Sequence, residues 1–296
     1  MWQVWSHPAA ILGQVRTAIV QDVYPPIAAA VDQHDPMFVR IRRHGRYMGG
    51  GFDRFRRSLS IPATCMFGSR AEADLAASHI LRFHTAMTGP EPVTGTDYVA
   101  GDPRHMLYAG LTAAHSALLC YEIYGPGRLC EKDRDRYFEE WATLMELVGV
   151  PSELVIPATS QQVREYFDSL APSLCVTEAA RPVLDLLFKV NLGELLHLDR
   201  HAPERIAIAI PLRIVAAAGL ALTPRRIRDL VGVDQSVFVD GLVIGGLRPL
   251  LRVMSLPALN DAVSRISYGP DLARRQQTAR RTAAMAHRAP RPPAAA

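Results

Sequence analysis

Histidine and arginine side chains are concentrated in the first 120 residues of the chain. Imidazole binds metal ions and carries protons near neutral pH, and guanidinium holds anions. Six of the histidines in this region are His34, His44, His79, His84, His105 and His115. The sequence contains no Walker loop, no GxGxxG after a strand, no HExxH and no GxSxG. Nucleotide chemistry is therefore not expected.

His84 lies near the end of a predicted helix over 70–87, beside the apolar stripe that this helix presents every three to four residues. Two interpretations of this imidazole remain open. It could bind iron through one ring nitrogen, or it could be a core histidine hydrogen-bonded to a backbone carbonyl. The second arrangement is the commoner one for a lone histidine on a helix shoulder.

Two arginines and a serine follow one another on the predicted helix 52–67. Arg54 and Arg57 are three residues apart and so share one helical face, and Ser58 is next to Arg57. Such a pair is either a solvated basic face or a site that holds an anion.

Strand formers are sparse, and long stretches rich in Ala, Leu and Arg predict an all-α fold. Capping residues and proline breaks predict further helices over 103–124, 131–148 and 159–170. Pro62 should kink its helix, residues 40–51 should form a basic, glycine-rich loop or a short helix, and residues 88–101 should form a surface connection.

No repeat or domain boundary is visible before the C-terminal tail, so residues 1–271 are expected to form a single helical domain. Residues 272–296 are rich in Ala, Pro and Arg, and we expect a flexible, disordered, dispensable tail there. Much of the formal net charge of +4 comes from this tail. Nucleic acid is not an expected partner, because the helix-turn-helix-like RRIRDLVG lacks a basic second helix.

The segment Ile206–Leu222 is the one candidate for contact with a membrane. It is short for a span and carries Pro211 and Arg213 near its middle, so a buried core helix is the favoured interpretation, and membrane-surface contact the alternative. The N-terminus lacks a basic region followed by an apolar run, which predicts a cytoplasmic protein. The four scattered cysteines are expected to be buried thiols.

The stretch FDRFRRSLSIPATCMFGSRAEADLAASHILRFHTAMTG, from Phe52 to Gly89, resembles the core of the rubber-oxygenase catalytic domain family. That family includes latex-clearing proteins and MpaB-type oxygenases. The resemblance extends back through QDVYPPIAAAVDQHD and forward through DPRHMLYAGLTAAHSALLCYEIYG, and in total it covers roughly residues 14 to 235.

The resemblance implies a globin-like helical core that holds one b-type haem. It implies that His84 is the axial imidazole on iron, and that Arg54, Arg57 and Ser58 form the distal cluster. Two guanidiniums there could hold a haem propionate or stabilise negative charge developing on oxygen. The expected partners are O₂ and an apolar small molecule or lipid.

The sequence also departs from the family pattern at several positions. Tyr24 and Gly110 stand where many relatives have histidine, and Arg57 replaces the lysine of latex-clearing members, so a lysine ligand to iron is not expected. No acid could be matched to the base proposed for rubber cleavage, and Gln33 lies near where one would fall. These departures argue against polyisoprene cleavage. The alternative to an oxygenase is a non-catalytic helical protein of the same fold that binds haem or lipid.

Overall fold

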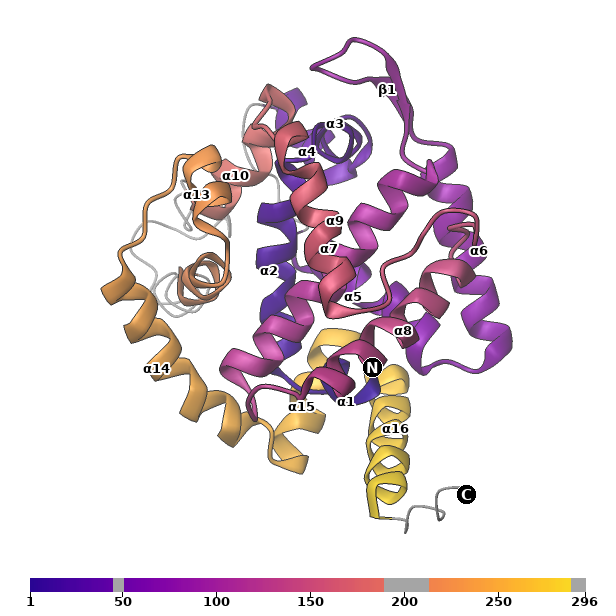
Figure 1. Cartoon of the computed structure of the whole chain (residues 1–296), viewed down its shortest axis with the longest axis vertical. Helices are drawn as coiled ribbons and strands as arrows, with labels where there is room; N and C mark the ends of the chain where they lie inside the picture. Colours follow the sequence, from indigo (N-terminus) through magenta and orange to yellow (C-terminus); the bar gives the residue numbers. More distant parts are fainter. Residues whose placement is uncertain (45–50, 189–212, 289–296) are drawn as a thin grey trace.

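The computed structural model describes residues 1–44, 51–188 and 213–288. Over these residues the chain is almost entirely helical (Figure 1), which confirms the all-α expectation. The strands described are a short antiparallel pair, β1 (Thr88–Pro90) and β2 (Asp97–Val99). They close a hairpin within the stretch predicted as a surface connection.

The centre of the fold is a pair of helices in close contact, α2 (Ala9–Asp22) and α7 (Pro103–Tyr124). Gly13 makes this approach possible, because a Cβ there would lie 3.0 Å from the backbone of Ser116 and Ala117. Arg16 is buried between the helices, and its guanidinium donates to Ser116 Oγ at 2.7 Å. The predicted start of α7 is correct, since the Asp102 carboxylate accepts the amide of Arg104 at the helix N-terminus.

Two further helices form a hairpin beside this pair, α5 (Gly51–Phe67) and α6 (Arg70–Thr85). Pro62 lies inside α5, as the predicted helix over 52–67 requires. Ser69 caps α6 in a reciprocal capping box with Glu72. The predicted helix over 70–87 is therefore present but ends two residues earlier.

The largest apolar core lies where these helices meet α8 (Glu131–Leu147) and α9 (Ser160–Leu170). Its buried aromatic side chains include Trp5 and Trp141, whose rings stack at 5.3 Å. Thr159 caps α9 by accepting the amide of Gln162, as its sequence spacing predicts.

Two helices on the N-terminal side cover one end of the core, α3 (Pro25–His34) and α4 (Pro36–His44). Residues 40–44 were expected in a loop or short helix and are the last turn of α4. The remaining elements of the description are α1 (Trp2–Trp5), the 3₁₀ turns η1 (Ala171–Ser173) and η2 (Glu178–Ala180), α10 (Arg181–Phe188), α13 (Arg225–Val231), α14 (Val237–Met254), α15 (Pro257–Tyr268) and α16 (Pro270–Arg288).

The segment Ile206–Leu222 lies partly outside the described residues. Its described part is helical over 213–221, where Ala218 and Leu220 are buried and Arg213 is exposed. None of the helices in the described ranges is long and apolar enough to cross a bilayer.

The expectation of a disordered tail from residue 272 is wrong for the part that the structure describes. Residues 270–288 form α16, in which Leu272 and Gln276 are buried. Gln276 Nε2 donates to the backbone carbonyl of Trp5 at 3.5 Å, and Arg275 forms an ion pair with Glu72. The composition of this segment suggested disorder because it has few large apolar groups. The segment is nevertheless helical, because those groups and several polar side chains contact distant parts of the chain. Residues 289–296 lie outside the description.

The cysteines divide into two kinds. Cys65 and Cys120 are buried, as expected, whereas Cys130 is exposed and Cys175 is half-buried. The prediction of buried thiols is therefore correct for two of the four.

Candidate functional site

His84 lies in the last turn of α6, on the side of the helix that faces the core. Its Nδ1 lies 2.7 Å from the carbonyl oxygen of Ile80. Because a carbonyl only accepts, Nδ1 carries the hydrogen and donates it, and Nε2 keeps its lone pair. Burial lowers the pKa of His84, and the hydrogen bond to Ile80 opposes this shift. His84 is therefore a neutral imidazole with a fixed tautomer, which is the form that binds iron.

Arg54 lies near the start of α5 and is held by two contacts. Its Nε donates to Asp35 Oδ2 at 2.6 Å, and its guanidinium carbon lies 5.2 Å from the centroid of the Phe38 ring. The side chain is 28 % exposed, so the charge is partly removed from water. The ion pair and the aromatic ring fix the direction of this charge.

The C-terminal end of α3 contacts two other parts of the chain, which are Arg54 near the start of α5 and the strand β1 that follows His84. Asp35, the residue after α3, pairs with Arg54, and the ring nitrogen Nε2 of His34 lies 3.0 Å from the carbonyl oxygen of Thr88 in β1. Met87, between His84 and that strand, packs against alanines of α3. The end of α3 is thus joined to the start of α5 through Asp35 and to β1, the strand after α6, through His34.

Arg57 and Ser58 are placed differently from Arg54. Both side chains are exposed on α5, and neither forms a hydrogen bond or an ion pair within the described part of the chain. The structure therefore brings Arg54 into contact with the end of α3, and leaves Arg57 and Ser58 on the surface of the same helix.

Asp22 is an acidic residue that sequence reasoning missed. It ends α2, it is 3 % exposed, and its Oδ2 has no hydrogen-bond partner in the described ranges. Burial raises the pKa of Asp22 well above its ordinary value, and the positive charge of Arg54 opposes this shift. Asp22 is therefore a buried carboxyl group that favours its protonated form, within the electrostatic influence of Arg54. As the sole acid of α2, at the end of its apolar stretch, it was open to detection from the sequence.

Tyr24, which the resemblance sets at a position where many relatives have histidine, contacts a histidine from another helix. Its hydroxyl lies 3.0 Å from Nδ1 of His105 on α7, and its ring lies 4.5 Å from the ring of Tyr108. Burial raises the pKa of Tyr24 and lowers the pKa of His105. A neutral phenol and a neutral imidazole thus share one hydrogen bond here, a pairing that the sequence did not reveal.

At Gly110, the second position where the resemblance sets a histidine in many relatives, a side chain of α8 fills the space. A Cβ at Gly110 would collide with the thioether of Met145, and Trp141 Nε1 lies 3.6 Å from that point. Trp141 Nε1 is buried and has no hydrogen-bond partner among the described residues. Met145 therefore occupies the space that a side chain at position 110 would need.

The imidazole of His84 suits a group that iron holds through one ring nitrogen. Its Nε2 lies in a half-buried setting and has no hydrogen-bond partner among the described residues. His84 belongs to no described cluster of three or more potential metal-binding side chains. A haem bound through a single histidine is compatible with this arrangement.

A cavity of about 410 Å³ lies elsewhere, where α8 and α9 begin. Its lining residues are Arg128, Leu129, Glu131, Arg134, Ser160 and Arg164. None of these is a predicted site residue, so this cavity is separate from the candidate site.

Comparison with known proteins gives one match of broad extent. Residues 2–256 match the family model described as ER-bound oxygenase mpaB/B′/rubber oxygenase, catalytic domain. No curated protein and no solved structure matches significantly. The match covers most of the chain, including α2 to α14 and every residue of the candidate site. The protein belongs to the mpaB/rubber oxygenase catalytic domain family.

Proposed function

We propose that the protein is a haem b-dependent oxygenase that acts on an apolar small molecule or lipid. The observation that carries this proposal is the state of His84, whose Nδ1–H is donated to the Ile80 carbonyl and whose Nε2 has no partner in the described part of the chain. Membership of an oxygenase catalytic domain family supports the same reaction class. Haem bound through His84 Nε2 would supply the redox chemistry that activates O₂.

Arg54 has the role of a fixed positive charge. Its ion pair with Asp35 and its position over Phe38 hold the guanidinium in one direction without reorganisation during the reaction. A charge held in this way stabilises negative charge that develops on oxygen. Arg57 and Ser58, which are exposed on the same helix, are proposed as contacts for the polar edge of the cofactor.

Asp22 is proposed as the carboxyl group that holds and releases a proton near Arg54. Burial raises the pKa of its carboxyl group well above the ordinary value and so favours the protonated form, and the positive charge of Arg54 opposes this shift. A change in the charge environment of Arg54 would therefore change the affinity of Asp22 for its proton.

The test is the absorption spectrum of protein purified from cells supplied with a haem precursor. Wild-type protein should show the intense band of bound haem, and His84→Ala should lose it with its helical circular dichroism unchanged. The matched control is His79→Ala, which removes an exposed histidine from the same helix. A colourless wild-type protein, or a full haem complement in His84→Ala, would contradict the assignment.

A non-catalytic haem- or lipid-binding protein is the second candidate function. The packing at Gly110 favours it, because Met145 fills the place of a histidine found in many relatives. Oxygen consumption in the presence of a reductant separates the two functions. If both the wild type and Arg54→Ala bind haem but consume no oxygen, the non-catalytic binding function is supported.

A further inference from the structure

α14 is apolar on two opposite sides. Its inner side, which includes Leu247 and Leu251, packs into an apolar cluster with α2 and α7. On its outer side Phe238, Leu242 and Val253 are 74 %, 60 % and 52 % exposed. A surface helix normally presents polar side chains to water, so the outer side of α14 is unusual for a helix that faces solvent.

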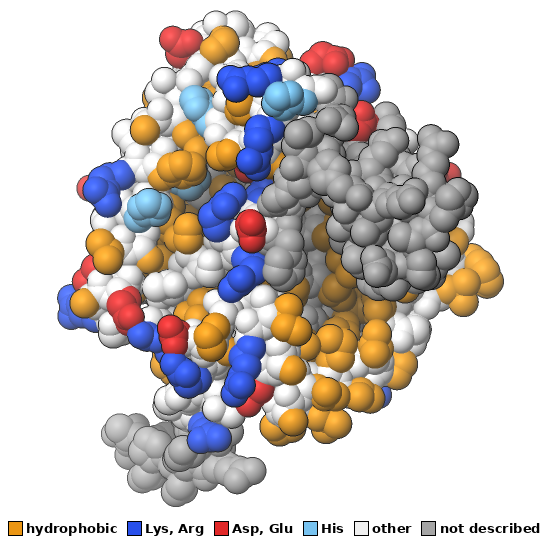
Figure 2. All heavy atoms as spheres, turned by 180° about the vertical axis from the view of Figure 1, so that it is seen from behind, with side chains coloured by type: hydrophobic (Ala, Val, Ile, Leu, Met, Phe, Trp, Pro, Cys, Tyr) orange, Lys and Arg blue, Asp and Glu red, His pale blue; other side chains and the backbone are white. Residues whose placement is uncertain are grey.

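The exposed apolar surface continues beyond α14. Leu256, Leu259 and Ile266, from the turn before α15 and from α15 itself, are 56 %, 44 % and 63 % exposed. A Cβ added at Gly241 or Gly245 of α14 would meet no atom within 4 Å, so this side of the helix is open. Figure 2 shows hydrophobic side chains gathered at the lower right of that view, where α14 lies. We call the surface formed by the exposed residues of 237–266 the α14 face.

The charges of the α14 face are all positive. Its arginines, Arg248, Arg252 and Arg265, are exposed and form no ion pair with any described residue. Phe238, Leu242 and Val253 share one stripe along α14, and Arg248 and Arg252 follow one edge of that stripe at helical spacing.

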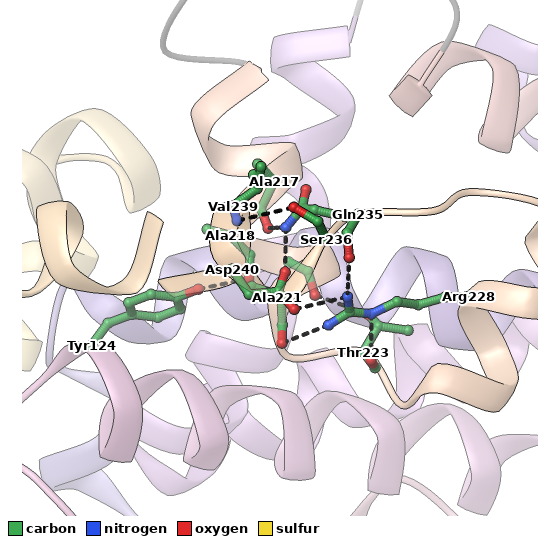
Figure 3. A network of polar contacts seen from close by, with 11 residues as sticks. Tyr124, Ala217, Ala218, Ala221, Thr223, Arg228, Gln235, Ser236, Val239 and Asp240 are labelled. Atoms are coloured by element: carbon green, nitrogen blue, oxygen red, sulfur yellow. Dashed lines mark hydrogen bonds and ion pairs between the residues drawn. The ribbon is translucent and has the colours of Figure 1, made fainter. Parts of the chain in front are cut away.

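The two acids of this segment, Asp240 and Asp261, are each paired with an arginine. Asp240 accepts from Arg228 at 2.9 Å and from Gln235 at 2.6 Å (Figure 3). Asp261 accepts from Arg280 at 2.7 Å. Neither acid therefore neutralises the arginines of the α14 face.

We propose that the α14 face lies in the surface of an anionic lipid bilayer. A helix with a wide apolar stripe and basic residues along its edge is suited to the boundary between headgroups and acyl chains. Phe238, Leu242 and Val253 enter that boundary, and Arg248 and Arg252 contact anionic headgroups. Since no described helix is long and apolar enough to cross, the contact is with the bilayer surface.

Charge decides between a bilayer and a second copy of the chain. A two-fold contact through the α14 face would bring the same unpaired arginines of two copies toward each other. Like charges so placed repel, whereas an anionic lipid surface attracts all three arginines.

The first experiment measures flotation of the full chain with vesicles of phosphatidylcholine containing phosphatidylserine. We expect Phe238→Ser combined with Leu242→Ser to weaken the partition at least about tenfold, because two apolar side chains no longer enter the bilayer. The matched control is Leu75→Ser combined with Val155→Ser, which removes two apolar residues that are 66 % and 79 % exposed elsewhere. This control should bind as the wild type does.

The second experiment separates the charge contribution. Arg248→Gln with Arg252→Gln should weaken partition onto the phosphatidylserine vesicles by about fivefold for each arginine. Partition onto phosphatidylcholine alone should be unchanged. Arg136→Gln with Arg181→Gln gives the same net charge at exposed positions outside the α14 face and should have little effect.

Three results would overturn the proposal. The first is a wild-type chain that floats with neither vesicle. The second is equal loss of binding in the two apolar double variants, with circular dichroism confirming that both are folded. The third is a dimer in sedimentation velocity that Phe238→Ser with Leu242→Ser dissociates, without vesicle binding by the wild type, which would assign the α14 face to a second copy.

Discussion

Arg54 of α5 forms an ion pair with Asp35, with 2.6 Å between Nε of the arginine and Oδ2 of the aspartate. Asp35 lies between α3 and α4, so the pair connects the start of α5 to the junction of two other helices. The side chains are 28 % and 18 % exposed, and the pair is thus shielded but not fully removed from water. Its main effect is to fix where Arg54 points.

Asp35→Asn should lower turnover more than it lowers stability. A partly exposed ion pair contributes about 0.2–1 kcal/mol to the free energy of unfolding. Under the proposed function, a displaced Arg54 should lower O₂-dependent turnover by roughly tenfold or more, with haem content unchanged. Asp32→Asn is the control, since it breaks a comparable pair with Arg42. A loss of haem in Asp35→Asn would show that the pair maintains the site as a whole.

Asp22→Asn should lose less stability than the wild type does when the pH is raised from 4 to 8, as measured by the free energy of unfolding. Burial raises the folded pKa of Asp22 above its unfolded value, so the folded chain binds this proton more tightly. The resulting stability is fully present below the unfolded pKa near 3.8 and is lost as the pH rises through the folded value. Asparagine does not titrate and avoids this loss.

Urea unfolding of Asp22→Asn and the wild type at the two pH values measures this difference. Asp74→Asn, at an exposed position of α6, is the control and should leave the pH dependence unchanged. An identical pH dependence in Asp22→Asn and the wild type would contradict the raised pKa.

Gly110→Ala should destabilise the protein, although alanine favours helix. The added Cβ collides with the Met145 thioether, and overpacking of this kind costs about 1–3 kcal/mol. Combining it with Met145→Ala should cost less than the sum of the two single substitutions, because the smaller side chain makes room. Denaturant unfolding of the four proteins gives the coupling, and strict additivity would exclude the contact.

Deletion of residues 270–296 should lower the free energy of unfolding by roughly 3 kcal/mol or more. It uncovers the apolar core at α1 and removes buried Leu272 together with the ion pairs of Arg275 and Arg280. Deletion of 289–296 alone removes none of these contacts and serves as the control. Equal melting temperatures for the two truncated proteins would show that α16 is dispensable.

Local signals were sufficient where a helix is determined by its own residues. Ser69 and Glu72 determine the start of α6, and Asp102 with Pro103 determines the start of α7, because capping uses side chains within three residues of the helix end. The family resemblance, from Phe52 to Gly89 and beyond, is confirmed by the match over residues 2–256.

Contacts between distant residues were not visible in the sequence. Residues 272–296 were predicted as disordered because they are rich in Ala, Pro and Arg and have few large apolar groups. The partners of Gln276 and Arg275, which are Trp5 and Glu72, lie far away in the chain. The partnership of Arg54 with Asp35 was missed for the same reason. Sequence spacing placed Arg54 and Arg57 on one face of a helix, but it could not show that only Arg54 contacts the end of α3.

The contact between α1 and α16 also bears on the order in which the protein assembles during synthesis. Trp5 and Gln276 are separated by 271 positions, so the part of α1 that α16 covers lacks this partner until long after α1 itself has been made. Until then the apolar groups of α1 that α16 covers are open to chaperones and proteases. Translation that stalls before residue 270 therefore yields a chain with most of its helices and an uncovered N-terminal surface, which quality control can recognise.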